Sequence, residues 1–379
     1  MKVLQVVADG APGGGTNHVM QLLRGMSNVD CGLVTQNGSY LFEQASKLGI
    51  PVIGGEFFRS RLDRQAVSTI KSAIGNFSPD LVHCHGGRAA FFRSFINSDI
   101  PTVYTVHGFH YARKSLMQKF AGWAAEFWSI RRTGRILFVC DHDKQLADNS
   151  YLMPTDKKFK VVYNGIKALQ PRPKTTDYGI GFVGRFVFQK HPELFVKMMQ
   201  QLPGMKAVMV GGGDLDAVVR DEISKRGLTD RVSLLGALDH ESALQVLSQL
   251  DMLVMTPRWE GLPLLPLEAM FMNVPVVSTA TGGIPEVITH RETGLLSENE
   301  DPDELAALVK ELSSDDELRR SIIANANRAA HERFSQEAML AQIRKCYEEL
   351  GDRPTQRGAS VLFPGDPAMP QTGNPIHRS

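Results

Sequence analysis

The segment Trp259–Glu268, which reads W-E-G-L-P-L-L-P-L-E, constrains the fold more than any other stretch of the chain. Just upstream, Gln249–Thr256 is a short and largely apolar run that predicts a buried parallel strand, and Ala269–Met272 downstream continues as helix. The segment is therefore predicted to be a strand-to-helix turn. Turns of this kind, at the carboxyl ends of parallel strands, are where doubly wound α/β folds bind ligands.

This turn carries groups that suit an anion flanked by hydroxyls. We expect Pro263 at the first helical position, which leaves the backbone N–H groups of Leu264 and Leu265 without helical partners and available to an anion. Glu260 and Glu268 stand on either side of this anion position. Carboxylates accept hydrogen bonds from vicinal hydroxyls rather than from phosphate. A ligand with central phosphate and hydroxyls at both ends is a sugar nucleotide. The alternative is a helix whose acidic first turn only interacts with the helix dipole.

The rest of the chain predicts two α/β domains. A chain of 379 residues is too long for one ordinary core and fits two domains of about 150 residues each. Short β-rich runs alternate with helical patterns in both halves, which indicates parallel sheets. We expect a domain over 1–167, a second over 168–330 after a polar, proline-bearing hinge, and a helix over 331–350. The stretch 351–379 lacks apolar periodicity and is expected to be a disordered tail.

Composition excludes several classes of protein. The net charge is +1 and 42% of the residues are hydrophobic, so nothing indicates a nucleic-acid partner. The four cysteines are far apart and form no C-x-x-C pair, which favours reduced thiols in the cytoplasm. The apolar stretch at 1–8 is too short for a signal peptide, and no apolar run has the length that spans a bilayer.

Three histidines stand at or near strand ends in the first half. His107 ends a β-rich run and precedes a glycine, so it is expected at the carboxyl edge of the sheet. His83 and His85 share one face of a strand, but no third ligand is near them in sequence. We therefore expect structural or cleft-lining roles for this pair rather than a metal site.

The segment 109–135 is basic and carries aromatic residues at helical spacing. Its only acidic residue is Glu126, and two of the three tryptophans, Trp123 and Trp128, lie in it. A basic amphipathic helix of this kind can lie on an anionic membrane surface. The alternative is a core helix with a solvated basic side, and the sequence leaves both open.

A second pair of charged residues follows the first strand of the second half. Arg185 and Lys190 stand just after the apolar run 179–183, where both side chains can reach a shared anion. Arginine offers a planar fork of donors and lysine a point charge.

Together these motifs resemble a known family. The run E260-G-L-P-L-L-P-L-E268, followed by P275-V-V-S-T-A-T-G-G-I-P-E-V-I288 and T293-G-L-L296, is similar to the donor-site signature of the large retaining glycosyltransferase family 4, and the similarity extends over about residues 1–350. The resemblance implies the GT-B fold, in which two Rossmann-like domains with doubly wound parallel sheets face a cleft. Its N-terminal domain binds the acceptor and its C-terminal domain the nucleotide sugar. Asn273 stands where the family usually has glycine, and asparagine also tolerates a left-handed backbone.

The resemblance also implies site residues. The expected catalytic residues are His107, Arg185, Lys190 and Glu260, and the expected donor-binding residues are Gly14, Leu238, Gly261, Leu262, Leu264, Leu265 and Glu268. In the family, the two cations neutralise charge on the leaving diphosphate in place of a divalent metal. No D-x-D motif is placed to serve a metal, so we expect neither a metal nor another cofactor.

The implied function is that of a retaining hexosyltransferase. It would move a sugar from a nucleotide-sugar donor, with a UDP-sugar favoured, to a hydroxyl of a polyprenyl-linked or growing surface glycan such as lipopolysaccharide, capsule or exopolysaccharide. Such a protein is expected to be cytoplasmic, with peripheral association at the inner face of the cell membrane as a candidate. The alternatives are a catalytically silent scaffold or lectin-like protein and a sugar-nucleotide epimerase. A phosphorylase would need a lysine-bound pyridoxal phosphate, for which no motif is found.

Overall fold

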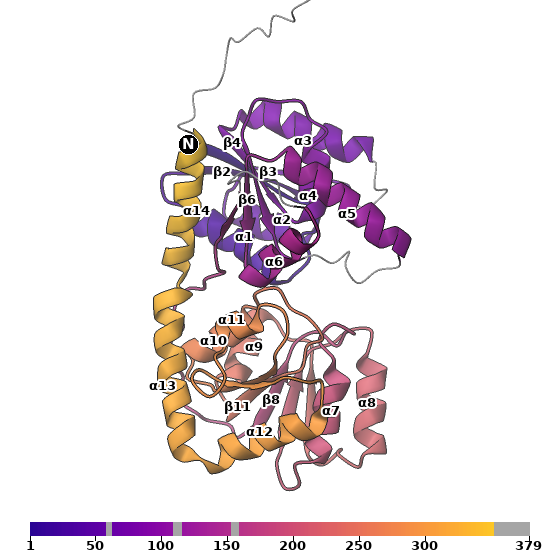
Figure 1. Ribbon diagram of the computed structural model, residues 1–379, viewed down its shortest axis with the longest axis vertical. Helices are drawn as coiled ribbons and strands as arrows, with labels where there is room; N and C mark the ends of the chain where they lie inside the picture. Colours follow the sequence, from indigo (N-terminus) through magenta and orange to yellow (C-terminus); the bar gives the residue numbers. More distant parts are fainter. Residues whose placement is uncertain (58–62, 109–115, 153–158, 352–379) are drawn as a thin grey trace, which may run out of the picture.

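Two parallel sheets, each flanked by helices, organise the structure. The computed structural model describes residues 1–57, 63–108, 116–152 and 159–351. Figure 1 shows the two sheets in separate bodies, one above the other, with the chain passing from the first to the second and returning in its last helices. The predicted α/β class with two doubly wound parallel-sheet domains is confirmed. The predicted disordered tail falls, from residue 352 onward, outside the described residues.

The first sheet has seven strands in the order β3-β2-β1-β4-β5-β6-β7. Its strands are β1 (Lys2–Val7), β2 (Asp30–Gln36), β3 (Val52–Gly55), β4 (Leu81–His85), β5 (Thr102–Val106), β6 (Arg135–Phe138) and β7 (Phe159–Val161). The helices between them are α1 (Gly14–Gly25), α2 (Tyr40–Lys47), α3 (Arg64–Phe77), α4 (Gly87–Arg93), α5 (Leu116–Arg131) and α6 (Asp141–Asn149). The strand order reverses between β1 and β4, and this switch point brings the carboxyl ends of those strands to a common ligand-binding edge.

The second sheet has six strands in the order β10-β9-β8-β11-β12-β13. Its strands are β8 (Ile180–Val183), β9 (Ala207–Val210), β10 (Val232–Gly236), β11 (Met252–Met255), β12 (Val276–Thr279) and β13 (Leu295–Ser297). Its helices are α7 (Pro192–Gln200), α8 (Asp216–Lys225), α9 (His240–Leu247), α10 (Leu265–Phe271) and α11 (Ile284–Val287). Here the order reverses between β8 and β11, the strands that precede the two charged motifs.

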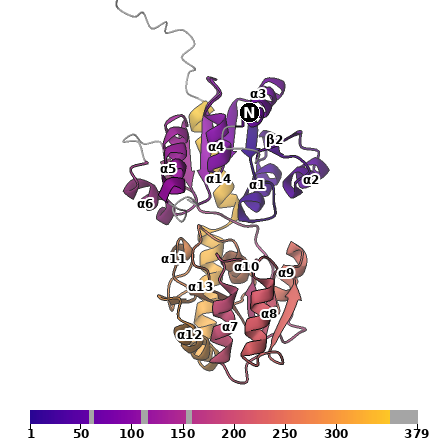
Figure 2. The same cartoon turned by 90° about the vertical axis from the view of Figure 1, so that its right-hand side faces the viewer.

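Three helices complete the chain and tie the bodies together. They are α12 (Pro302–Ser314), α13 (Asp316–Arg333) and α14 (Gln336–Gly351), and Figures 1 and 2 show α13 beside the second sheet and α14 beside the first. Met339, Ile343 and Tyr347 of α14 are buried in one cluster with Val3 and Leu22 of the first domain. Within the described residues, no helix has both the length and the apolar character needed to cross a membrane.

The turn after α10 shows how a local residue choice positions the site. Asn273 has a φ of 61°, so the left-handed conformation expected for this departure from glycine is confirmed. Its side-chain oxygen also accepts a hydrogen bond from the Asn327 amide at 3.1 Å, which ties the turn to α13. The chain can thereby reverse from α10 into β12.

Substitution of Asn273 tests this turn. A β-branched residue in the left-handed region is strained by about 1–2 kcal/mol, so we expect Asn273→Val to lower the free energy of unfolding by that amount. Asn273→Gly relieves the backbone requirement and loses only the contact with Asn327, so its effect should be clearly smaller. Urea unfolding of both variants measures the difference. Equal losses in the two variants would show that the backbone conformation is not what asparagine provides here.

Candidate active site

The two charged motifs of the second domain meet in an ion pair. Lys190, after β8, and Glu260, after β11, are in contact through Nζ and Oε1, with both side chains largely buried. Gln189 adds a hydrogen bond from Nε2 to the Trp259 carbonyl oxygen at 3.1 Å. The loops that follow two neighbouring strands are therefore joined at the switch point of the sheet, where ligands bind in this class of fold.

The start of α10 differs from the sequence prediction. The helix begins at Leu265 with Leu264 as its N-cap and Pro266 in its first turn, so the prediction of Pro263 at the first helical position is wrong. Proline is equally suited to either of the first positions because neither N–H there has a helical partner. In the described part of the chain, no backbone hydrogen bond engages the N–H groups of Leu264 or Leu265. The predicted free amides are therefore present, although the helix starts later.

Glu268 lies in the first turn of α10. Its side chain is buried, and this burial raises the pKa of the carboxyl, while His240 across a 3.6 Å separation acts in the opposite direction. Such a carboxyl has lone pairs to offer to hydroxyl donors in a water-poor setting.

Arg185 and Leu238 occupy the rim of the same end of the second domain. Arg185 is exposed one residue beyond Gly184, and its guanidinium makes no hydrogen bond or ion pair with the residues that the structure describes. Leu238, on the other side, is partly exposed and lines a hollow together with Leu235, Gln245 and the chain around Thr175. The structure thus places Leu238 beside α9, apart from the ion pair.

Glycines allow a second loop to stack against the β11–α10 loop. A Cβ on Gly282 would lie 1.8 Å from the Glu260 carbonyl oxygen, and one on Gly283 would lie 2.3 Å from that of Gly261. Gly282 also has a φ of +59°. Only glycine permits this approach, so the β12–α11 loop supports the backbone that presents Glu260.

The first domain contacts this loop directly. Asn164 donates a hydrogen bond from Nδ2 to the Leu262 carbonyl oxygen at 3.0 Å. A Cβ on Gly261 would be 3.5 Å from both the His107 carbonyl oxygen and a carboxylate oxygen of Asp143. The predicted residues Gly261 and Leu262 therefore form the seam between the two domains.

His107 and the glycine-rich loop after β1 lie on the first domain's side of this seam. A Cβ on Gly15 would be 3.8 Å from the His107 ring, whereas one on Gly14 would have open space around it. His107 Nε2 is 3.3 Å from Nδ1 of His85, at the end of β4. The structure therefore brings Gly14 and His107 to the same face that meets the β11–α10 loop.

Comparisons with known proteins agree with this arrangement. The model described as Glycosyltransferase Family 4 matches residues 12–168, and the model described as Glycosyl transferases group 1 matches residues 167–329. An uncharacterized glycosyltransferase of Methanocaldococcus jannaschii is 27% identical over 74% of this chain and 79% of its own length. The lipopolysaccharide core biosynthesis mannosyltransferase LpsB of Rhizobium meliloti is 33% identical over 45% of this chain and 51% of its own.

A solved structure gives the same fold. Anabaena HepE in complex with UDP-glucose has a TM-score of 0.81 to this chain at 20% identity, covering 92% of this chain and 100% of HepE. The chain is a glycosyltransferase of the GT-B fold. Its two sheets lie on either side of the seam described above.

Several contacts at or near the seam were not predicted from sequence. His18 and Asn164 are buried and joined through Nδ1 and Oδ1 at 3.0 Å, although they are far apart in the chain. Glu286 accepts hydrogen bonds from the backbone N–H groups of Asp141 and His142 in the other domain, both at 2.8 Å. The sequence around Asn164 and Glu286 does not indicate a partner that is distant in the chain. Only the structure therefore reveals these contacts.

Glu126, on α5 of the first domain, is a half-buried acid. It accepts a hydrogen bond from the Tyr104 hydroxyl at 2.9 Å, and a Cβ on Gly87, at the start of α4, would be 2.1 Å from Oε1. Burial raises the pKa of the Glu126 carboxyl to about 7, while the Tyr104 hydrogen bond opposes the rise. The carboxyl is therefore largely protonated in the folded protein below neutral pH.

This raised pKa predicts a pH dependence of stability. Because the unfolded carboxyl has an ordinary pKa of 4.5, it loses its proton first as the pH rises, and the glycosyltransferase loses stability between about pH 4.5 and about pH 7. Glu126→Gln keeps an acceptor for Tyr104 and cannot titrate. We expect the variant to gain about 1–2 kcal/mol relative to the parent between about pH 5 and about pH 7 in urea unfolding. The exposed Glu43→Gln variant is the control, and parallel pH profiles of parent and Glu126→Gln would contradict the assignment.

Proposed function

We propose that the enzyme is a retaining hexosyltransferase that uses a nucleotide sugar, with a UDP-sugar favoured. The observation that carries the proposal is the contact between Lys190 and Glu260. A cation suited to phosphate and a carboxylate suited to hydroxyls lie side by side, as the phosphate and the hexose do in such a donor. The exposed Arg185 and the unpaired amides of Leu264 and Leu265 supply further donors for the same diphosphate.

In the proposed reaction, the bond between the anomeric carbon and the diphosphate oxygen breaks. A new bond forms from the acceptor oxygen to that carbon on the same face, and the acceptor proton passes to the departing phosphate. Arg185, Lys190 and the loop amides stabilise the negative charge of the leaving group. Glu260 holds the hexose hydroxyls with His107 opposite, and Glu268 holds the ribose hydroxyls.

The proposal of a UDP-sugar donor and a surface-glycan acceptor is supported by relatives. HepE has been solved with UDP-glucose, and LpsB is a mannosyltransferase of lipopolysaccharide core biosynthesis. We infer a polyprenyl-linked or growing surface glycan as the acceptor. A silent scaffold or lectin-like protein remains the contrasting hypothesis, and a sugar-nucleotide epimerase is the other; neither would form a new glycosidic bond.

The experiment is nucleotide release from a panel of UDP-, GDP- and ADP-sugars with a polyprenyl-linked glycan as acceptor, and the anomeric configuration of the product is read by NMR. Arg185→Ala should lower kcat about 10²–10³-fold, because one charge-stabilising donor is lost from the transition state. Arg220→Ala, which breaks a surface pair with Asp216 in α8, is the matched control. Absence of product with every donor, or a wild-type rate in Arg185→Ala, would refute the proposed reaction.

We also propose that α5 lies on an anionic membrane surface at the inner face of the cell membrane. The part of the basic segment before Leu116 lies outside the described residues. Leu116, Met117 and Phe120 have 84%, 84% and 70% of their surfaces exposed. Trp123 and Phe127 pack instead against the core of the first domain. The C-terminal half of α5 therefore packs against the core, whereas its first turns expose apolar side chains.

Co-sedimentation with vesicles tests this surface. We expect the enzyme to bind phosphatidylglycerol vesicles more strongly than phosphatidylcholine vesicles, because Lys119 and Arg131 add electrostatic attraction. The variant Leu116→Ser/Met117→Ser/Phe120→Ser should bind at least about tenfold more weakly, since burial of one such side chain is worth about 1.5 kcal/mol or more. Leu48→Ser, at an exposed leucine after α2, is the control. Equal binding by the triple variant and the control would refute a membrane role for α5.

A further inference from the structure

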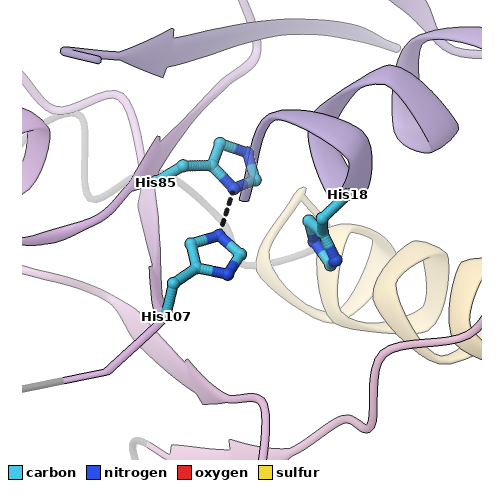
Figure 3. Close-up of side chains that lie close together, drawn as sticks. All are labelled: His18, His85 and His107. Carbon is cyan, nitrogen blue, oxygen red and sulfur yellow. Dashed lines mark hydrogen bonds between the residues drawn. The ribbon is translucent and has the colours of Figure 1, made fainter. Parts of the chain in front are cut away.

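Three imidazoles from separate elements converge in the first domain. They belong to His18 of α1, His85 at the end of β4 and His107 after β5, and one ring nitrogen of each lies within 4.8 Å of the others (Figure 3). His83, although adjacent in sequence, has both ring nitrogens engaged, by the Tyr347 hydroxyl at 2.6 Å and by the Thr105 hydroxyl at 2.7 Å. The group is therefore defined by folding rather than by sequence spacing.

Neighbouring amides fix which nitrogens of two rings keep a lone pair. Asn164 donates through its NH₂ group to the Leu262 carbonyl, so its oxygen faces His18 Nδ1 at 3.0 Å and that nitrogen carries the proton. The Gln5 oxygen likewise lies 2.8 Å from His85 Nε2. The nitrogens left with a lone pair are Nε2 of His18 and Nδ1 of His85, and both rings belong to the converging group.

His18 Nε2 is the nitrogen that ordinary packing does not explain. It is buried and has no hydrogen-bond partner in the described structure. An unpaired buried polar atom costs about 1–3 kcal/mol, so a ligand that engages it would recover that energy.

The spacing of the group suits a metal ion. The separation of 3.3 Å between His85 Nδ1 and His107 Nε2 equals the roughly 3.3 Å between two ligands of a tetrahedral zinc ion with bonds of 2.0–2.1 Å.

We propose that His18 Nε2, His85 Nδ1 and His107 Nε2 form a binding site for one first-row transition-metal dication of the zinc type. Three nitrogen ligands without a carboxylate select zinc, cobalt, nickel or copper over magnesium and calcium. Asn164 and Gln5 are the outer partners that orient two of the ligands, as the second shell does in known histidine sites. Three protein ligands leave a fourth position for water or another ligand.

The metal has a consequence for transfer that rests on the proposed function. His107 is the residue proposed to face the donor hexose, and a metal ion engages the same ring. Zinc therefore inhibits transfer, and removal of zinc by a chelator restores it. The site acts as a metal-sensitive brake, distinct from any need for a metal in the reaction.

Direct binding tests the site without reference to activity. Metal-free protein without a histidine tag is titrated with Co²⁺, and the visible absorption of nitrogen-coordinated cobalt is followed. Calorimetry with Zn²⁺ then gives the stoichiometry. We expect one ion per chain and displacement of cobalt by zinc. The four cysteines are all buried, so they should not compete.

Variants decide whether the ion occupies this group. His107→Ala, at a half-buried position, and His18→Gln should each abolish the cobalt absorption, and Asn164→Ala should weaken zinc binding about 10–100-fold. His331→Gln, at an exposed position on α13, is the control and should bind as the parent does. Circular dichroism identifies any variant that has not folded, and His107→Ala keeps the test valid if His18→Gln fails. Absence of binding by the parent, or unchanged binding by His107→Ala, overturns the proposal, whereas inactivity toward every sugar donor leaves this binding result unaffected.

Discussion

The whole site depends on a cap that one domain provides for a helix of the other. The Glu286 carboxylate accepts hydrogen bonds from the first two N–H groups of α6, and Arg333 donates to the Glu286 carbonyl oxygen at 3.1 Å. Hydrogen bonds to a carboxylate are stronger than neutral ones, and the N-terminus of α6 favours negative charge. This contact places the β12–α11 loop against the first domain. Because that loop also supports the β11–α10 loop, the position of Glu260 relative to His107 follows from it.

Close backbone packing then explains why the motifs are rich in glycine. Gly261 lies between the His107 carbonyl on one side and Gly283 on the other, and a Cβ on Gly283 would lie only 2.3 Å from the Gly261 carbonyl oxygen. The β12–α11 loop therefore approaches the β11–α10 loop through backbone atoms. The glycines therefore permit close packing between the two loops as well as local turns.

The sequence was informative wherever the signal was local. The strand-to-helix turn, the left-handed Asn273 and the two parallel sheets could be predicted because alternation, prolines and glycines report local backbone geometry. The start of α10 was placed two residues early, since two prolines both suit a first turn. Contacts between distant segments could not be predicted. The spacing of His83 and His85 indicates no metal site because no third ligand is near them in the sequence, whereas folding brings His18 and His107 to His85.

The division of charge between the domains bears on the proposed reaction. The formal charges of Arg185, Lys190 and Glu260 all come from the second domain, so a leaving diphosphate meets its stabilising groups on one side. The first domain presents imidazoles, and burial lowers the pKa of His18 and His85 far enough that neither is an effective base near neutral pH. In the proposed reaction, the proton of the acceptor hydroxyl goes to the departing phosphate, whose basicity rises as its bond to the hexose breaks. The proposed transfer on the same face of the hexose agrees with this step, because the phosphate leaves from that face.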